Sequence, residues 1–297
     1  MSADAGHLQV AHLSIGFEGR RPYPWQRPAA AVQALDDVSL EVAPGEFVAV
    51  IGPSGCGKSS LLNAVAGFQR PASGAITIDG RPVIGPGADR GVVFQQYSLF
   101  PWMSVRANVE YGLKRRGMPR AQRRERAREL LAMAGLSSIE TMFPEQLSGG
   151  MRQRVGIVRA LATSPRILLM DEPFGALDAQ TRTIMQELLT SMWRSLRLSV
   201  LLITHDIDEA IFLSDRIYVM TARPGRIKEI VPVPLARPRD EATTRSVEFF
   251  SIRSRLLALL RDESLKAFDD DAPRATTDAE PSAPAGEPVA YATAPEG

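Results

Sequence analysis

A loop of eight residues has the types and spacing needed to bind phosphate. Gly52–Ser59 reads Gly-Pro-Ser-Gly-Cys-Gly-Lys-Ser, which matches the pattern G-x-x-x-x-G-K-[ST]. It lies between a predicted strand and a predicted helix, so backbone N–H groups and the positive end of the helix can face one anion. We expect a nucleotide to be bound by Gly52, Pro53, Ser54, Gly55, Cys56, Gly57, Lys58, Ser59 and Ser60. Lys58 should reach the β- and γ-phosphates, and the Ser59 hydroxyl should bind Mg²⁺.

Two carboxylates follow an apolar strand further along the chain. The segment Ile167–Met170 is followed by Asp171 and Glu172, and the carboxyl ends of such strands form the edge where ligands of α/β proteins bind. Asp171 is suited to hold Mg²⁺, which prefers oxygen ligands, and Glu172 to polarise an attacking water. An acidic strand end alone is more often a solvated terminus. In a chain with a phosphate-binding loop, the functional interpretation is favoured.

A third segment indicates the family. Leu147–Arg154, Leu-Ser-Gly-Gly-Met-Arg-Gln-Arg, closely resembles the signature sequence of ATP-binding cassette (ABC) proteins. The Ser and two Gly residues open a predicted helix and would form a second anion site. A generic helix start is the alternative for these residues alone, but other motifs occur in the family's order. Gln95 matches the Q-loop, Asp178 the D-loop and His205 the switch histidine.

The resemblance covers about Leu8 to Val233 and implies two like subunits packed head to tail around ATP and Mg²⁺. One subunit would supply the catalytic residues Lys58, Gln95, Glu172 and His205 and the Mg²⁺ ligands Ser59, Gln95 and Asp171. The other would supply Ser148, Gly149, Gly150 and Asp178 to the same nucleotide. Met151 departs from the family, which usually has Gln there. Phe17 best matches the aromatic residue that stacks on adenine, with Tyr23 and Trp25 as rivals.

Short apolar strands that alternate with helix-like segments predict the elements that position these residues. They indicate an α/β fold with a mostly parallel central sheet, interrupted by an α-helical insertion. The resemblance implies that this fold is a P-loop NTPase core with an N-terminal antiparallel β part and an inserted α-helical subdomain. The expected strands are Leu8–Leu13, Val38–Val42, Phe47–Ile51, Ala75–Ile78, Gly91–Phe94, Ile167–Asp171, Val200–Thr204 and Arg216–Met220.

The expected domain organisation has three parts. Residues 1–235 form the ATPase domain, with the helical insertion at about 98–153, and residues 236–268 form a helical extension. In the extension, apolar residues at helical spacing predict one amphipathic helix: Phe249, Ile252, Leu256, Leu257 and Leu260. We expect it to pack on its own domain, with a role in dimer contacts as the alternative. The acidic, Pro-rich segment 269–297 is expected to be disordered. The basic run Lys114–Arg124 is interpreted as a solvated helix face and not as a site for an anionic partner.

Composition limits the compartment and the partners. The chain of 297 residues carries 35 basic and 34 acidic residues, a balance that argues against nucleic acid as the main partner. Cys56 is the single cysteine, which fits a reducing compartment. No run of about 18 apolar residues and no signal peptide is found, so we expect a cytoplasmic protein that meets the membrane only through a partner.

One cassette without a repeat, a coiled-coil insertion or a membrane span resembles the ATPase subunit of a bacterial importer. The finer resemblance is to the nitrate, sulfonate and taurine group, through Gly85–Gln95, Leu99–Trp102 and Asp171–Asp178. It implies a small anionic solute and a homodimer at the cytoplasmic face of the membrane. Integral membrane permease subunits and, indirectly, a solute-binding protein would be its partners. The alternative is a non-transport ABC ATPase acting on nucleic acid or the ribosome. The apolar residues after Gln95 are expected, as a set, to line a groove for the permease: Tyr97, Leu99, Phe100, Pro101 and Trp102. The alternative, which we accept for Leu99, is that they pack the insertion onto the core.

Overall fold

The structure is a computed structural model that describes residues 5–17 and 31–271, with side chains described to residue 265. The rival aromatic residues Tyr23 and Trp25, and the tail beyond residue 271, lie outside the described residues. Among the described residues, no helix has the length and apolar character needed to cross a bilayer.

The central sheet has six strands in the order β10-β9-β3-β8-β7-β6. All neighbouring pairs are parallel except β9 and β10, which form an antiparallel hairpin at one edge. The strands are β3 Phe47–Ile51, β6 Arg90–Val93, β7 Ile167–Asp171, β8 Ser199–Ile203, β9 Arg216–Met220 and β10 Ile227–Pro232. β3 and β8 are buried at every position, as strands covered on both faces should be. The mostly parallel α/β sheet expected from the sequence is therefore confirmed.

A second sheet of four antiparallel strands, in the order β2-β1-β4-β5, covers one face of the core. Its strands are β1 Leu8–Phe17, β2 Val32–Val42, β4 Ser73–Ile78 and β5 Arg81–Pro82. β1 and β2 are longer than the sequence predicted, and β5 and β10 were not predicted. The two missed strands are short or contain charged residues, so they lack an apolar pattern. They are strands because they pair with a neighbouring strand.

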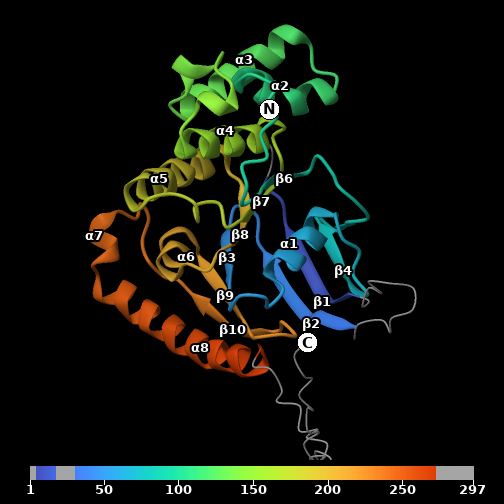
Figure 1. The fold of residues 1–297 in the computed structure, drawn as a ribbon, viewed down its shortest axis with the longest axis vertical. Coiled ribbons are helices and arrows are strands. Elements are labelled where there is room, and N and C mark those ends of the chain that lie inside the picture. The colour runs from blue at the N-terminus through green and yellow to red at the C-terminus, as the bar shows by residue number, and fades with distance from the viewer. Residues whose placement is uncertain (1–4, 18–30, 272–297) are drawn as a thin grey trace, which may run out of the picture.

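Alternate residues of β3 enter two apolar clusters, one on each face of the central sheet. Phe47, Ala49 and Ile51 join the helices α4 (Gly149–Ala162), α5 (Ala179–Leu196) and α6 (Ile207–Leu213). Val48 and Val50 join the antiparallel sheet and α1 (Lys58–Ala66). In Figure 1, α1 and the blue strands lie on one side of the central sheet, with α6 and the C-terminal helix on the other. The start of α1, which follows β3, therefore lies near the carboxyl end of β7, although β8 separates the two strands in the sheet.

The helical insertion forms one end of the molecule (Figure 1). It contains α2 Val105–Arg115, α3 Arg120–Met133, two short 3₁₀ turns at Ser137–Ile139 and Pro144–Gln146, and the start of α4 Gly149–Ala162. α4 packs against α2 and α3 at this end, and it continues nine residues past the expected end of the insertion at 153 to reach β6 and α5. α4 is thus a rigid connection between the insertion and the core.

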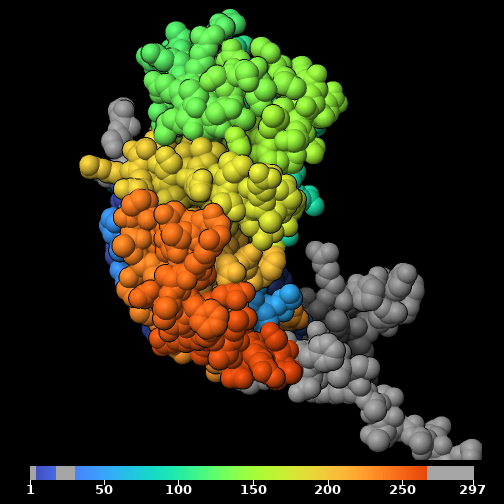
Figure 2. All heavy atoms as spheres, turned by 90° about the vertical axis from the view of Figure 1, so that its left-hand side faces the viewer, coloured from blue at the N-terminus to red at the C-terminus, as the bar shows by residue number. Residues whose placement is uncertain are grey.

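The C-terminal helices α7 Glu241–Thr244 and α8 Val247–Asp271 cover one face of the core, seen as the orange-to-red surface in Figure 2. Phe249 and Leu256 are buried as expected. Leu257 is 47% exposed, so its assignment to the packed face was wrong; one helical step of 100° carries it past the contact with α6. Residues 269–271 are helical, which corrects the expected start of disorder at Asp269.

Candidate nucleotide-binding site

The phosphate loop joins β3 to α1, as the sequence predicted. Gly57 is the N-cap of α1 with φ of 100°, and a Cβ there would lie 2.8 Å from the Ala34 carbonyl oxygen. Only glycine fits both the backbone conformation and this close approach. Lys58, the first residue of α1, is 7% exposed, and its Nζ donates to the carbonyl oxygens of Gly52 at 2.8 Å and Pro53 at 2.9 Å. The ammonium group is thus held inside the loop at the helix N-terminus.

Other residues of the loop are supported from outside it. Gly55 has φ of 74°, and its carbonyl oxygen accepts two hydrogen bonds from the Arg223 guanidinium, at 3.1 and 3.3 Å. Cys56 is buried, and desolvation raises the pKa of its thiol, so the side chain packs the loop and is not a reactive thiolate. Ser54 is exposed and Ser60 is half-buried at the start of α1. Sequence reasoning missed Arg223, because its role depends on the β9–β10 turn reaching back to the loop.

The two carboxylates lie at the end of β7, next to the phosphate loop. The Ser59 hydroxyl lies 3.4 Å from Asp171 Oδ1. Burial raises the pKa of Asp171, the Ser59 hydrogen bond lowers it, and the neighbouring Glu172 raises it. A bound cation would relieve the cost of burying this charge. The backbone of Glu172 has a φ of 43°, which is unusual for a residue other than glycine. Its N–H donates to the Ile203 carbonyl oxygen at 2.8 Å and so extends the pairing of β7 with β8.

Three of the expected catalytic residues meet at Glu172. Gln95 Nε2 donates to Glu172 Oε2 at 3.1 Å, and His205 Nδ1 lies 3.2 Å from Glu172 Oε1. These side chains come from the ends of β6, β7 and β8, neighbours in the parallel sheet. The Ser59 hydroxyl, the Asp171 carboxylate and the Gln95 amide oxygen are the donors that could hold Mg²⁺, which suits oxygen ligands. No cluster of three or more His, Cys, Asp or Glu with metal-site geometry occurs in residues 5–17 and 31–265.

Phe17 lies at the end of β1, on the side of the phosphate loop. Ile15 of β1 pairs with Leu35 of β2. The Leu35 side chain lies against Gly57 of the phosphate loop, where an added Cβ would meet it. Phe17 pairs with Val32 beyond this point and is 47% exposed, so its ring is free to receive a flat ligand. Its two rivals fall outside the described residues.

The signature and the D-loop form a separate surface. Ser148 and Asp178 are exposed N-caps of α4 and α5, accepting from the N–H groups of Met151 at 3.3 Å and Thr181 at 3.0 Å. The two helix starts touch, because a Cβ at Gly150 would lie 2.7 Å from Thr181 Cγ2. Tyr97 contacts the same surface, with its hydroxyl 3.1 Å from where a Cβ of Gly149 would be. No described hydrogen bond or ion pair joins this surface to the phosphate loop of its own chain.

Residues 35–175 match the family model described as ABC transporter. An uncharacterized ABC transporter ATP-binding protein of Methanocaldococcus jannaschii is 53% identical over 236 residues, covering 80% of this chain and 87% of that protein. The nitrate import ATP-binding protein NrtD of Synechocystis is 46% identical over 263 residues, covering 86% of this chain and 95% of that protein.

A second importer protein and a solved structure are similar over most of the chain. The taurine import ATP-binding protein TauB of Chromobacterium violaceum is 52% identical over 236 residues, covering 78% of this chain and 90% of that protein. Among solved structures, the dimeric post-hydrolysis state of the ATP-binding cassette MJ0796, bound to ADP and Pi, has a TM-score of 0.65 at 32% identity. It covers 77% of this chain and 100% of that chain.

Proposed function

The chain belongs to the ABC transporter ATP-binding family, and from this premise we propose that it hydrolyses ATP to drive an importer of a small anionic solute. The observation that carries the proposal is the meeting of Gln95, Glu172 and His205 beside the phosphate loop, at 3.1 and 3.2 Å. A carboxylate with an amide and an imidazole around it can hold and polarise one water molecule. ATP is the nucleotide of the family.

The residues divide the work of hydrolysis. Lys58 is already held at the helix N-terminus and would exchange its carbonyl partners for the β- and γ-phosphates. Glu172 would accept a hydrogen bond from the attacking water, and His205, beside it, would contact the γ-phosphate. Ser59, Asp171 and Gln95 would hold Mg²⁺, which, when bound, supplies positive charge to the phosphates. Phe17 would stack on the adenine ring.

We infer that the active unit is a head-to-tail homodimer. Ser148 and Asp178 are exposed on one continuous surface that does not face the phosphate loop of its own chain. The similar cassette structures are dimeric. In this arrangement the Ser148 hydroxyl, with the N–H groups of Gly149 and Gly150, would face the ATP held by the partner subunit's phosphate loop.

The domain division expected from the sequence remains part of the proposal. Residues to about 235 form the ATPase domain, and α7 and α8 form an extension attached to it. The buried Glu263 on α8 accepts from the Ala222 N–H at 3.0 Å and pairs with Lys228 at 2.9 Å, both in the β9–β10 hairpin. The extension is thus anchored at the strand edge and does not reach the catalytic cluster.

A patch of aromatic side chains is the proposed contact with the permease. Phe100 lies 4.7 Å from Tyr111 and 5.7 Å from Trp102, measured between ring centroids. Trp102 is 70% exposed, which is unusual for so large an apolar side chain. The patch is at the start of the insertion, a few residues after Gln95, so closure of the ATP site would move it. Leu99 packs on the core and is not part of the patch.

Through the permease the chain would lie peripherally on the cytoplasmic face of the membrane, with a solute-binding protein as an indirect partner. The relatives named for nitrate and taurine import favour a small anionic solute of the nitrate, sulfonate or taurine type. None of these relatives supports the alternative, a non-transport ATPase acting on nucleic acid or the ribosome.

The test is ATP hydrolysis by the complex assembled with its permease and solute-binding protein. We expect taurine, another sulfonate or nitrate to stimulate hydrolysis, and the double variant Phe100→Ala/Trp102→Ala to abolish assembly or stimulation. The variant should keep its fold and its basal hydrolysis as an isolated chain, with Phe143→Ala, another exposed aromatic of the insertion, as the control. Absence of stimulation by any small anion would refute the importer assignment. Unfolding of the double variant would show that the patch is part of the core.

A further inference from the structure

A closed ring of hydrogen bonds flanks the switch histidine on both sides. The Thr204 hydroxyl donates to Glu209 Oε2 at 2.7 Å and accepts from the Asp206 N–H at 3.0 Å. Asp206 Oδ1 in turn accepts from the Glu209 N–H at 3.0 Å. Thr204 and Glu209 are 1% and 4% exposed, so the hydrogen bond between them is shielded from water, whereas the Asp206 side chain is 28% exposed. His205 has no part in the ring, but the ring fixes the backbone on both sides of it.

Arg182 connects this ring to the D-loop. Its Nη1 donates to Asp206 Oδ2 at 2.8 Å, and its Nη2 donates to the Leu177 carbonyl oxygen at 3.3 Å. Leu177 directly precedes Asp178, the D-loop residue. One planar guanidinium therefore binds both the loop around His205, here called the switch loop, and the D-loop, and so fixes their relative position. A lysine ammonium cannot reproduce this geometry.

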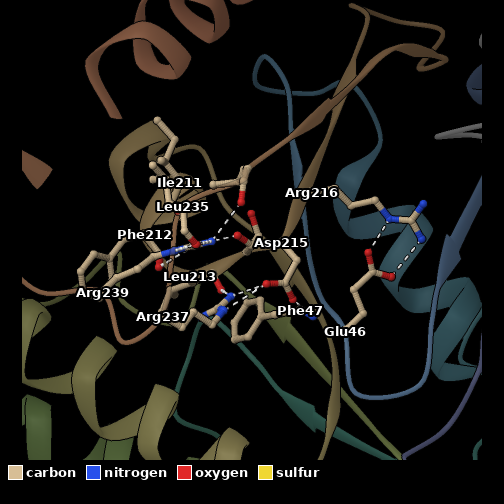
Figure 3. Close-up of polar contacts among 12 residues, drawn as sticks. Glu46, Phe47, Ile211, Phe212, Leu213, Asp215, Arg216, Leu235, Arg237 and Arg239 are labelled. Carbon is tan, nitrogen blue, oxygen red and sulfur yellow. Dashed lines mark hydrogen bonds and ion pairs between the residues drawn. The ribbon is translucent and has the colours of Figure 1, made fainter. Parts of the chain in front are cut away.

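The far end of α6 is fixed as well, so the ring rests on a rigid helix. The buried Arg239 donates to the carbonyl oxygens of Ile211 at 2.8 Å, Phe212 at 3.1 Å and Ser214 at 2.6 Å. Figure 3 shows this guanidinium lying across the end of α6, with Arg237 and Asp215 paired beside it.

A small cavity joins the ring to the catalytic carboxylate. Its volume is about 20 Å³, and Glu172, Gly175, Arg182, His205 and Glu209 are among its lining residues. Glu209 Oε1 and Arg182 Nε are buried without a described hydrogen-bond partner. A cavity of this size has room for one water molecule, and these two groups supply polar partners for it. One water molecule in this cavity would therefore link Glu209 to Glu172 electrostatically.

We propose that Arg182 and Glu209 are positioning residues for ATP hydrolysis, which set the orientation of His205 against Glu172 and couple the switch loop to the D-loop. The inference rests on the proposed ATPase function. Neither residue touches the nucleotide. Because Asp178 would serve the partner subunit's ATP, the Arg182 link would make each site sensitive to the state of the other.

The first test compares Arg182→Ala with Arg194→Ala, an exposed arginine on the same helix that serves as the control. We expect Arg182→Ala to lower kcat by about 10- to 100-fold, the cost of misplacing a catalytic group by about 1 Å. The nucleotide Kd should stay within about threefold of the wild-type value, and the Hill coefficient for ATP should fall toward one. Arg182→Lys keeps the pair with Asp206 and loses the fork to Leu177, so it should be intermediate.

A kcat for Arg182→Ala within twofold of the control would overturn the proposal. So would a parallel loss of kcat, nucleotide affinity and melting temperature, which would mark a structural residue only. A wild-type chain without any ATP hydrolysis would instead refute the proposed function itself.

The second test uses the pH dependence of kcat. The charged and titratable groups that face Glu209 are Arg182 from α5, Glu172 from β7, His205 and Asp206 from the switch loop, and Asp208, which pairs with Arg253 of α8. Burial raises the pKa of Glu209 to about 7. Glu209→Gln keeps the contact with Thr204 and removes the titration, so the kcat profile between pH 6 and 8 should change shape. A profile that coincides with that of the wild type would contradict the role of Glu209.

Discussion

Lys58 and Ser148 both lie at the start of a helix, yet their surroundings are opposite. Lys58 is buried and its ammonium has two carbonyl partners in its own loop. Ser148 is exposed, and its described side-chain hydrogen bond stays within the first turn of its own helix. Both helix starts can offer N–H groups to an anion. In the proposed dimer, the phosphate half of the ATP site is supplied within one chain, whereas the signature half would be completed by a second copy.

The carboxylates differ in the same way. Burial raises the pKa of Asp171 beside the phosphate loop. Hydrogen bonds from Thr181 lower the pKa of the exposed Asp178 in the D-loop. Asp171 would gain from a cation at its site, while Asp178 is a stable anion that presents its charge to solvent or to a partner. Variants of the phosphate half and of the signature half should therefore behave differently.

The largest effect is expected in the phosphate half. Lys58→Ala removes the cation held within the loop, and loss of one preorganised charge typically costs about 3–4 kcal/mol in the transition state, or 10²–10³-fold in kcat. Nucleotide binding by the isolated chain should weaken strongly too. Lys114→Ala, an exposed lysine on the insertion, is the control. A Lys58→Ala variant that retains more than about a tenth of wild-type turnover would contradict the role of Lys58 in the phosphate half of the site.

The buried character of the switch region can be measured through stability. An unfolded chain loses the Glu209 proton near pH 4.5, whereas the folded chain keeps it until about pH 7. The folded state binds more protons between these values, so the free energy of unfolding should fall as pH rises from 4.5 to 7, by about 3 kcal/mol from this group. Chemical denaturation at several pH values should show this fall in the wild type and lose it in Glu209→Gln. Equal pH dependence in both would mean that Glu209 is hydrated.

The smallest effect on the isolated chain is expected at the signature. Ser148→Ala removes an N-cap and should cost about 1 kcal/mol of stability. Nucleotide affinity of the monomer should not change, because the residue does not reach the phosphate loop of its own chain. Turnover should fall, because in the proposed dimer Ser148 would face the ATP bound by the partner subunit. A nucleotide Kd that rises as much as in Lys58→Ala would show that Ser148 acts within its own chain.

The sequence predicted those parts of the site that depend on local pattern. The phosphate loop, the carboxylates at the end of β7 and the buried parallel strands follow from residue order and apolar runs. Arg182, Glu209 and Arg223 were missed because their contacts depend on how α5, α6 and the β9–β10 turn pack. Leu257 shows the opposite error, since helical spacing alone cannot tell a packed position from its exposed neighbour.

In the proposed dimer, ATP joins two copies of this chain, phosphate loop to signature. Glu172→Gln keeps the shape of the side chain and cannot take a proton from water, so ATP should bind and hydrolysis should stall. Size-exclusion chromatography of this variant with Mg-ATP should show a dimer that outlives the wild-type dimer and disappears when Ser148→Arg is added. A variant that stays monomeric at nucleotide concentrations that saturate binding would contradict the head-to-tail site.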